Sequence, residues 1–257
     1  MSDTTIRRAL AVARLIGRER HTDNQPPRLV VFPELSVPAD SMPTLLRFVR
    51  ATGAMVLAGL ELRSALTGRR QLNELVWIIP SSGENTRPLV LLQHKIHVTA
   101  AERSLSPPIL PADPAVIWRI GTQPERLAAI NCYEFTDLAL RELLRGRVEA
   151  LIIAANNRDV PTFDNLVEST HYDLFCHVVL VNAENFGGSA IRAPYKEPHH
   201  RRIFDIHGGD LFAVNLCELD ITAFRRTVPV MPSTPIDSSP IERRPIKTHP
   251  ANFKVRR

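Results

Sequence analysis

Cysteine is scarce in this chain of 257 residues, which contains only three. Cys132, Cys176 and Cys217 are far apart, and no pair is spaced as Cys-x-x-Cys. An odd number of cysteines at such spacings argues against a disulfide framework and against a zinc knuckle. It favours a protein of a reducing compartment, and we expect a cytoplasmic localisation.

Long apolar segments and targeting signals are missing as well. No run of residues approaches the roughly 20 apolar residues that a helix needs to cross a membrane. No apolar stretch follows the arginines near the start, as it would in a signal peptide. The chain has no GxGxxG after a predicted strand and no GxxxxGK(S/T), so nothing supports nucleotide binding. We therefore expect no membrane partner.

Positive charge is concentrated at the C-terminal end. The whole chain has a net charge of +5, whereas residues 225–257 contain eight Lys or Arg and two acids, a net +6. The other 224 residues therefore sum to −1, which disfavours a uniformly basic nucleic-acid-binding domain. Residues 228–257 hold six prolines and no apolar periodicity, which predicts a Pro-rich basic tail where a nucleic acid could bind.

Apolar periodicity divides residues 1–227 into alternating helices and strands. Residues at helical spacing predict a helix over the first 22 residues, and continuous apolar runs predict buried strands. Further helices are predicted at residues 42–52, 138–145 and 166–175. Strands are predicted at residues 29–32, 54–62, 72–79, 89–97, 126–132, 150–155, 177–182, 189–193 and 211–216. The alternation indicates an α/β or layered α+β fold.

Three reactive side chains lie at the ends of apolar runs of strand length: Glu34, Lys95 and Cys132. A strand end is a rigid place from which a side chain can enter a pocket. A thiol, a carboxylate and an ammonium can together perform acyl transfer. The thiolate attacks carbon, the carboxylate moves protons, and the ammonium stabilises the negative charge that develops. The ammonium should also lower the pKa of the Cys132 thiol.

Short motifs surround these residues in a fixed order: FPEL at residues 32–35, KIHV at residues 95–98 and NCYE at residues 131–134. Successive reactive residues are separated by 61 and 37 positions. In order and spacing the motifs resemble the nitrilase superfamily of carbon–nitrogen hydrolases. Residues 181–189 resemble the family's Asn-rich strand and Gly-Ser turn, so that the resemblance covers residues 28–227.

The resemblance implies that residues 1–227 form one nitrilase-like domain, a four-layer αββα sandwich, and that such sandwiches pair into oligomers. It implies hydrolysis of a small molecule at a non-peptide amide, nitrile or carbamoyl group, through an acyl-enzyme linked to Cys132. Glu34 is then the base and Lys95 the electrostatic stabiliser, with no metal and no organic cofactor. Glu102, seven residues after Lys95, matches a glutamate that often supports the lysine in this family.

Four more residues are candidates for substrate binding. Tyr133 and Glu134 directly follow the predicted nucleophile, and Asn156 and Asn157 follow the predicted strand at residues 150–155. The common amidase version of the family carries Arg-Phe-Pro-Glu after the cysteine, and this chain does not. The substrate, and the choice between hydrolysis and acyl transfer, therefore stay open.

Two other functions stay open beside the hydrolase. Nitrilase-like domains also occur joined to reverse transcriptases in bacterial defence systems. The chain could likewise be a nitrilase-fold assembly module that associates with nucleic acid through its basic tail. A nonenzymatic scaffold is the third alternative, and the presence of Glu34, Lys95 and Cys132 together argues against it.

We predict a homo-oligomer, at least a dimer. Family members usually open with an apolar strand, whereas this sequence starts directly in a predicted helix. The strand at residues 29–32 would then have an open edge, which favours pairing. Light scattering at micromolar concentration should give at least twice the chain mass of 28.8 kDa. A single monomeric mass would contradict this prediction.

Overall fold

The computed structural model describes residues 1–20, 28–81, 87–121, 125–210 and 212–224. The predicted tail at residues 228–257 lies outside the described residues, so the division into domain and tail stays a prediction. Within the described part of the chain, no helix is long and apolar enough to cross a membrane.

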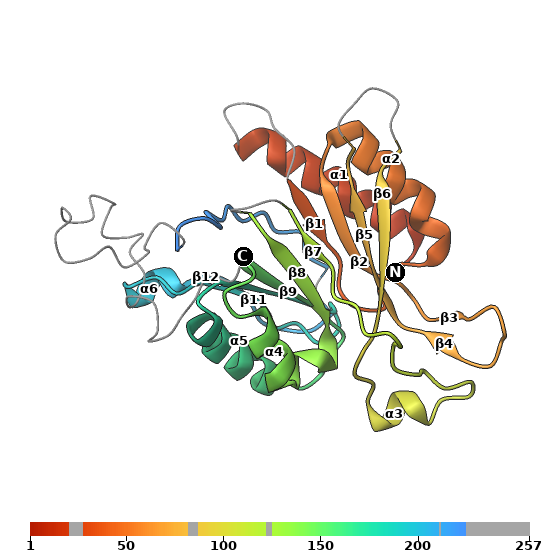
Figure 1. Ribbon diagram of the computed structural model, residues 1–257. Coiled ribbons are helices and arrows are strands. Elements are labelled where there is room, and N and C mark those ends of the chain that lie inside the picture. Colours follow the sequence, from red (N-terminus) through yellow and green to blue (C-terminus); the bar gives the residue numbers. More distant parts are fainter. Residues whose placement is uncertain (21–27, 82–86, 122–124, 211, 225–257) are drawn as a thin grey trace.

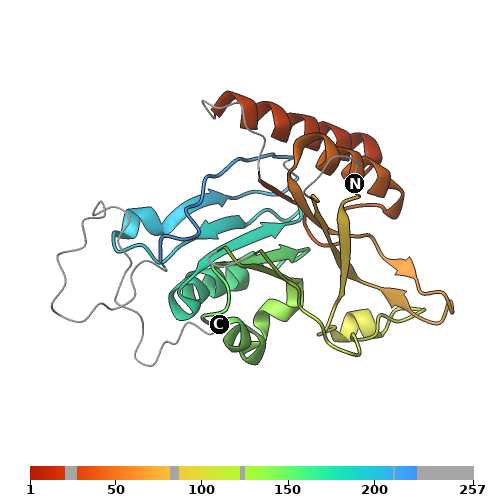
Figure 2. The ribbon, with the colours of Figure 1, turned by 45° about the horizontal axis from the view of Figure 1, so that its top comes forward.

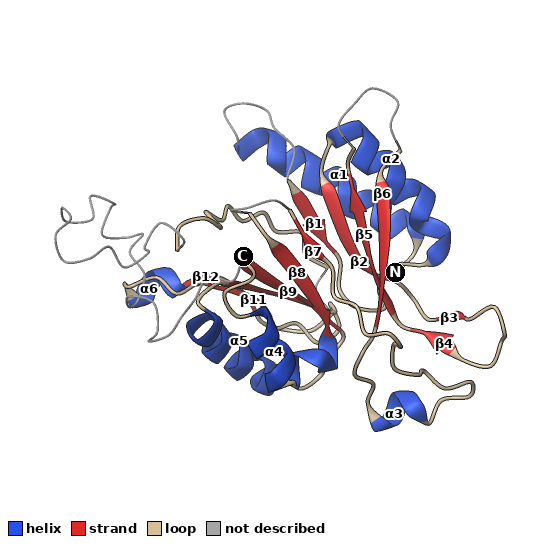
Figure 3. Cartoon of the chain, viewed as in Figure 1, coloured by secondary structure: helices blue, strands red, loops and turns tan. Residues whose placement is uncertain are grey.

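Two β-sheets stand at the centre of the fold (Figures 1 and 3). The first, in the order β1-β2-β5-β6, contains β1 (Leu29–Val31), β2 (Met55–Gly59), β5 (Glu74–Ile79) and β6 (Leu89–His94). The second, in the order β12-β11-β10-β9-β8-β7, contains β7 (Arg119–Ile120), β8 (Leu127–Asn131), β9 (Ala150–Ala155), β10 (His177–Asn182), β11 (Ser189–Arg192) and β12 (Arg202–Ile206). A separate small pair joins β3 (Arg63–Ser64) to β4 (Gln71–Leu72).

Helices cover the outer face of each sheet (Figure 2). On the first sheet lie α1 (Asp3–Arg20) and α2 (Met42–Thr52), and Leu45 of α2 packs in the same core as Val56 of β2. On the second lie α4 (Leu138–Leu144) and α5 (Val160–Leu174), and Val167 of α5 shares a core with Ile153 of β9. The two inner faces meet in a third core that contains Trp77. The predicted αββα sandwich is therefore confirmed.

The central strands of the second sheet follow directly from their sequences. All six residues of β9 are buried, and β9 pairs in parallel with both β8 and β10. A parallel strand with helices on one side and a second sheet on the other has no solvent face, so its sequence is apolar throughout. The same arrangement carries the C-terminal ends of β8 and β9 to one edge of the sandwich, where the site lies.

Several predicted element boundaries were wrong. Residues 212–216 form no strand; the sheet is completed instead by β12, which follows the short helix α6 (Pro198–Arg201). Helix α5 begins at Val160 rather than at residue 166, because the Asp159 side chain accepts a hydrogen bond from Thr162 N and Pro161 occupies the first turn. Strand β6 ends at His94, and a short helix, α3 (Ala100–Arg103), follows it.

The outer edge of β1 is open to further pairing. Among the described strands, β1 pairs only with β2. A cavity of about 1100 Å³ is lined by residues of β1 and α1, by strands β9 to β12 of the second sheet, and by the irregular segment 212–222. Segment 212–222 therefore lies beside the position that the opening strand of the family would occupy. It does not form a strand there.

His177, at the start of β10, carries a buried imidazole whose protonation should oppose folding. Its side chain is 0% exposed, and its ring centroid lies 5.1 Å from that of Phe224. Burial lowers the pKa of the His177 imidazole to about 4. As the pH falls, the unfolded chain, with an ordinary pKa of about 6.5, takes up the proton first. The stability that neutral His177 contributes is thus present above pH 6.5 and is lost as the pH falls towards 4.

We predict that His177→Phe makes the free energy of unfolding less sensitive to acid. Through this imidazole the wild type should lose up to about 1.4 kcal/mol per pH unit between pH 6.5 and 4, and the variant should not. Urea denaturation at a series of pH values measures the difference, with His207→Gln, a change at an exposed position, as the control. Equal acid sensitivity of wild type and His177→Phe would contradict the prediction.

Candidate active site

Three strand ends bring Glu34, Lys95 and Cys132 together. Glu34 lies in the turn after β1, Lys95 is the first residue after β6, and Cys132 is the first residue after β8. Their exposed fractions are 4%, 3% and 7%. The Glu34 carboxylate and the Lys95 ammonium both lie close enough to the Cys132 thiol to affect its pKa. Buried charges need partners to stay charged, so the contacts among these groups decide what the site can do.

The turn that presents Glu34 packs directly on the end of β2. A Cβ atom at Gly59 would lie 2.4 Å from both Glu34 Cα and Pro33 O, so only glycine allows this approach. Ser36 N and Val37 N both donate to Gly59 O, at 3.0 Å each. The glycine and these two hydrogen bonds fix the backbone from which the Glu34 carboxylate projects.

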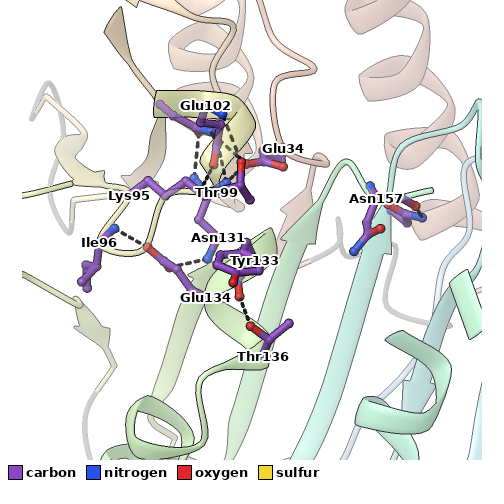
Figure 4. A network of polar contacts seen from close by, with 12 residues as sticks. Glu34, Lys95, Ile96, Thr99, Glu102, Asn131, Tyr133, Glu134, Thr136 and Asn157 are labelled. Atoms are coloured by element: carbon purple, nitrogen blue, oxygen red, sulfur yellow. Dashed lines mark hydrogen bonds and ion pairs between the residues drawn. The ribbon is translucent and has the colours of Figure 1, made fainter. Parts of the chain in front are cut away.

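Lys95 joins two carboxylates (Figure 4). Its Nζ lies 2.8 Å from Glu34 Oε1 and 2.7 Å from Glu102 Oε1. Burial opposes the charge on the ammonium, but the nearby Glu34, Cys132 and Glu102 outweigh it and raise the pKa of Lys95 above its ordinary value. The lysine is therefore a fixed cation at neutral pH.

Glu102 is held by its own helix. It lies in the first turn of α3, where Thr99 N donates to Glu102 Oε2 at 2.7 Å and Glu102 N donates to Thr99 Oγ1 at 3.1 Å. This reciprocal capping fixes the carboxylate beside the lysine. Burial opposes ionisation of Glu102, but the charge and hydrogen bond of Lys95 outweigh it and lower the pKa of the carboxyl.

The expectation of a lowered pKa for Cys132 was wrong in direction. Burial, followed by the charge of Glu34, raises the pKa of the thiol well above its ordinary value. Lys95 and a hydrogen bond from the Asn156 N–H act the other way and offset only part of the increase. Sequence reasoning counted the ammonium but not the loss of water around the sulfur. The Cys132 thiol is consequently neutral and lies next to the Glu34 carboxylate.

Glu134 connects two loops of the site through hydrogen bonds. Its carboxylate is 0% exposed and accepts hydrogen bonds from Ile96 N, after Lys95, and from Asn131 N, before Cys132. Burial raises the pKa of Glu134 to about 7, although these hydrogen bonds act in the opposite direction. The contacts indicate a structural role, while its predicted role in substrate binding stays a prediction.

The other three candidates for substrate binding differ in position. Tyr133, directly after Cys132, is 44% exposed, so that its ring is accessible. Asn156 follows β9, and its backbone N–H lies close enough to the Cys132 thiol to affect its pKa. Asn157 lies apart from the Lys95 group in Figure 4, where its N donates to Asn182 Oδ1 at 2.9 Å. These positions leave Tyr133 and Asn156 next to the Cys132 thiol and Asn157 farther away.

Sequence reasoning missed Asn73 and Asn131. Asn73 lies between β4 and β5, is 2% exposed, and contacts Glu34, Glu102 and Asn131. Its only sign in the sequence is a polar residue inside the apolar run at residues 72–79.

In the described part of the chain, no group of three His, Cys, Asp or Glu side chains is placed to hold a metal ion.

Comparisons with solved structures identify the fold. Nit3 of Saccharomyces cerevisiae, a member of branch 10 of the nitrilase superfamily, has a TM-score of 0.62 and 16% identity over 90% of this chain and 90% of that chain. A mutant of the amidase from Nesterenkonia sp. AN1, also of the nitrilase superfamily, has a TM-score of 0.60 and 13% identity over 80% and 79%. Another mutant of that amidase, with a TM-score of 0.58 and 13% identity over 79% and 82%, carries acrylamide added at its active-site cysteine.

At these identities the likeness shows that the chain has the fold of the nitrilase superfamily. No family model matches the chain, and no match was found among curated proteins. None of the three structures supports the alternative function as a nucleic-acid-associated module or a link to reverse transcriptases.

The high pKa of Cys132 predicts an unusual pH profile for its alkylation. A free thiol stops gaining reactivity once the pH exceeds its pKa of about 8.5, whereas Cys132 should continue to gain above pH 9. Glu34→Gln removes the negative charge that helps to raise this pKa, so the profile should move to lower pH. Mass spectrometry of the peptide that contains Cys132 after iodoacetamide treatment measures the rate, with N-acetylcysteine as the reference. A profile that matches the reference, or that Glu34→Gln leaves in place, would be incompatible with the site described.

Proposed function

We propose that the chain hydrolyses a non-peptide carbon–nitrogen bond of a small molecule, with Cys132 as the nucleophile. The observation that carries the proposal is the buried group at three strand ends, in which one ammonium binds two carboxylates beside a neutral thiol. A thiol, a base within hydrogen-bond reach and a fixed cation are the components that acyl transfer requires.

For an amide, the proposed reaction begins when the Cys132 thiol passes its proton to Glu34 and the thiolate attacks the carbonyl carbon. The negative charge that develops on oxygen is stabilised by the Lys95 ammonium. Glu34 then gives its proton to the leaving nitrogen, the carbon–nitrogen bond breaks, and an amine or ammonia leaves a thioester on Cys132. Glu34 next takes a proton from water, and the hydroxide attacks the thioester carbon. The carbon–sulfur bond breaks, the acid is released, and Glu34 returns its proton to the Cys132 sulfur.

Glu102 is proposed to support Lys95 rather than to move protons, since it contacts the ammonium and its own helix. Tyr133, Glu134, Asn156 and Asn157 are proposed to position the substrate. The fold shared with amidases of the nitrilase superfamily is compatible with this chemistry. The proposal extends to assembly: a homo-oligomer, as the open edge of β1 favours association.

We predict that Cys132→Ala, Glu34→Gln and Lys95→Ala each remove turnover without unfolding the protein. General-base catalysis alone contributes about 100-fold or more, and residues that act as one unit lose most of the rate singly. The measurement is ammonia release from a panel of small aliphatic amides and nitriles, with folding checked by circular dichroism. Cys217→Ser, a thiol outside the group, is the control and should retain the wild-type rate. A triple variant far slower than every single variant would contradict the common mechanism.

A further inference from the structure

Asn73 makes an unusual number of contacts with the site for a residue that is neither acid nor base. Its side-chain Nδ2 lies 2.9 Å from Glu34 Oε1 and 3.1 Å from Glu102 Oε1. Its Oδ1 accepts from Asn131 Nδ2 at 2.9 Å, and its main-chain carbonyl accepts from Lys95 N, also at 2.9 Å. Every one of these contacts goes to the ion group or to the residue that precedes Cys132.

The orientation of the Asn73 amide is determined by its neighbours. Asn131 Nδ2 can only donate, so Asn73 must present its oxygen there and its nitrogen to the two carboxylates. A flipped amide would place oxygen against two carboxylate oxygens and nitrogen against nitrogen. The amide also adds two donors without adding charge, in a group where one ammonium already serves two carboxylates.

These contacts give the two carboxylate oxygens of Glu34 different roles. Oε1 accepts from both Lys95 Nζ, at 2.8 Å, and Asn73 Nδ2. An oxygen that accepts two such donors has little capacity for a third, so that Oε2 is the oxygen of Glu34 with capacity for a further donor. Asn131, directly before Cys132, completes a chain of hydrogen bonds from the nucleophile's own strand end to the base.

We propose that Asn73 is a positioning residue, which with Asn131 holds Glu34 Oε1 so that Oε2 faces the Cys132 thiol. The inference deepens the proposed function, because it assigns separate tasks to the two oxygens of the base. The hydrogen-bond chain itself is independent of which substrate is hydrolysed. A readout on the thiol therefore tests the inference without any substrate.

The test is the pH profile of Cys132 alkylation by iodoacetamide in Asn73→Leu, Asn73→Asp, Glu34→Gln and the double variant Asn73→Leu/Glu34→Gln. The groups that face the thiol are Glu34, Lys95 and, through the lysine, Glu102. Asn73→Leu frees the Glu34 carboxylate to move away from the thiol, so the profile should move to lower pH by about half a unit. Asn73→Asp keeps the size of the side chain and adds a negative charge, so its profile should move to higher pH.

The double variant separates positioning from a purely structural role. If Asn73 acts through Glu34, Asn73→Leu should cause no further shift once Glu34 is already Gln. Gln93→Leu is the matched control: this amide is 1% exposed, bonds Ala129 O at 2.9 Å, and should change stability but not the profile. An unmoved profile in Asn73→Leu, or an equal shift with and without Glu34, would overturn the inference.

Activity provides an independent second readout. With a hydrolysed amide in hand, Asn73→Leu should lower kcat about 10-fold or more and leave KM nearly unchanged, because the base and not the binding site is displaced. If the alkylation profiles behave as expected but no amide or nitrile is hydrolysed, the proposed function fails and the positioning role stands. If hydrolysis occurs and the profiles do not move, the positioning role fails alone.

Discussion

The ammonium of Lys95, buried between the carboxylates of Glu34 and Glu102, determines the arrangement of the site. Removing such ions from water costs several kcal/mol each, and the cost is offset only while the partners stay at hydrogen-bond distance. Nζ lies 2.8 Å and 2.7 Å from the two oxygens, so this condition is met. Because Glu34 comes from the turn after β1, whereas Lys95 and Glu102 come from the end of β6 and the helix α3 that follows it, the ion group connects two segments that are distant in the sequence.

This charge balance also explains how Cys132 can be neutral at rest and still serve as the proposed nucleophile. With a neutral thiol, one positive charge faces two negative charges. A thiolate whose proton escaped to water would add a third negative charge in a site with little water, which raises the pKa of the thiol. A proton that moves from Cys132 to Glu34 leaves the net charge of the group unchanged. The proton can thus be transferred during the proposed reaction without a large electrostatic cost. Lys95 then lies near the negative charge of the Cys132 thiolate.

The layers of the fold could be predicted from the sequence, because long apolar runs bounded by turns report burial on both faces. Strand β9 is the clearest case, with all six residues buried as expected. The run at residues 211–216 has a similar composition but forms no strand in its described part, since pairing depends on which neighbours are available and not on composition.

The candidate site was predictable only in part, for a comparable reason. The types, order and strand-end positions of Glu34, Lys95 and Cys132 are local features that a sequence displays. The contacts of Asn73 arise only when the end of β4 lies beside the turn after β1 and the end of β8, which is a tertiary relation. The raised pKa of Cys132 likewise depends on desolvation, which no local motif reports.

The most direct test of the account is to look for the acyl group on Cys132 during turnover. Protein incubated with small amides or nitriles, quenched in acid and digested, should carry the acyl mass on the peptide that contains Cys132. If Cys132 is the nucleophile, this adduct should form in the wild type, together with ammonia release, and should be absent in Cys132→Ala. Ammonia release at an undiminished rate by Cys132→Ala, or acylation confined to Cys176 or Cys217, would contradict it.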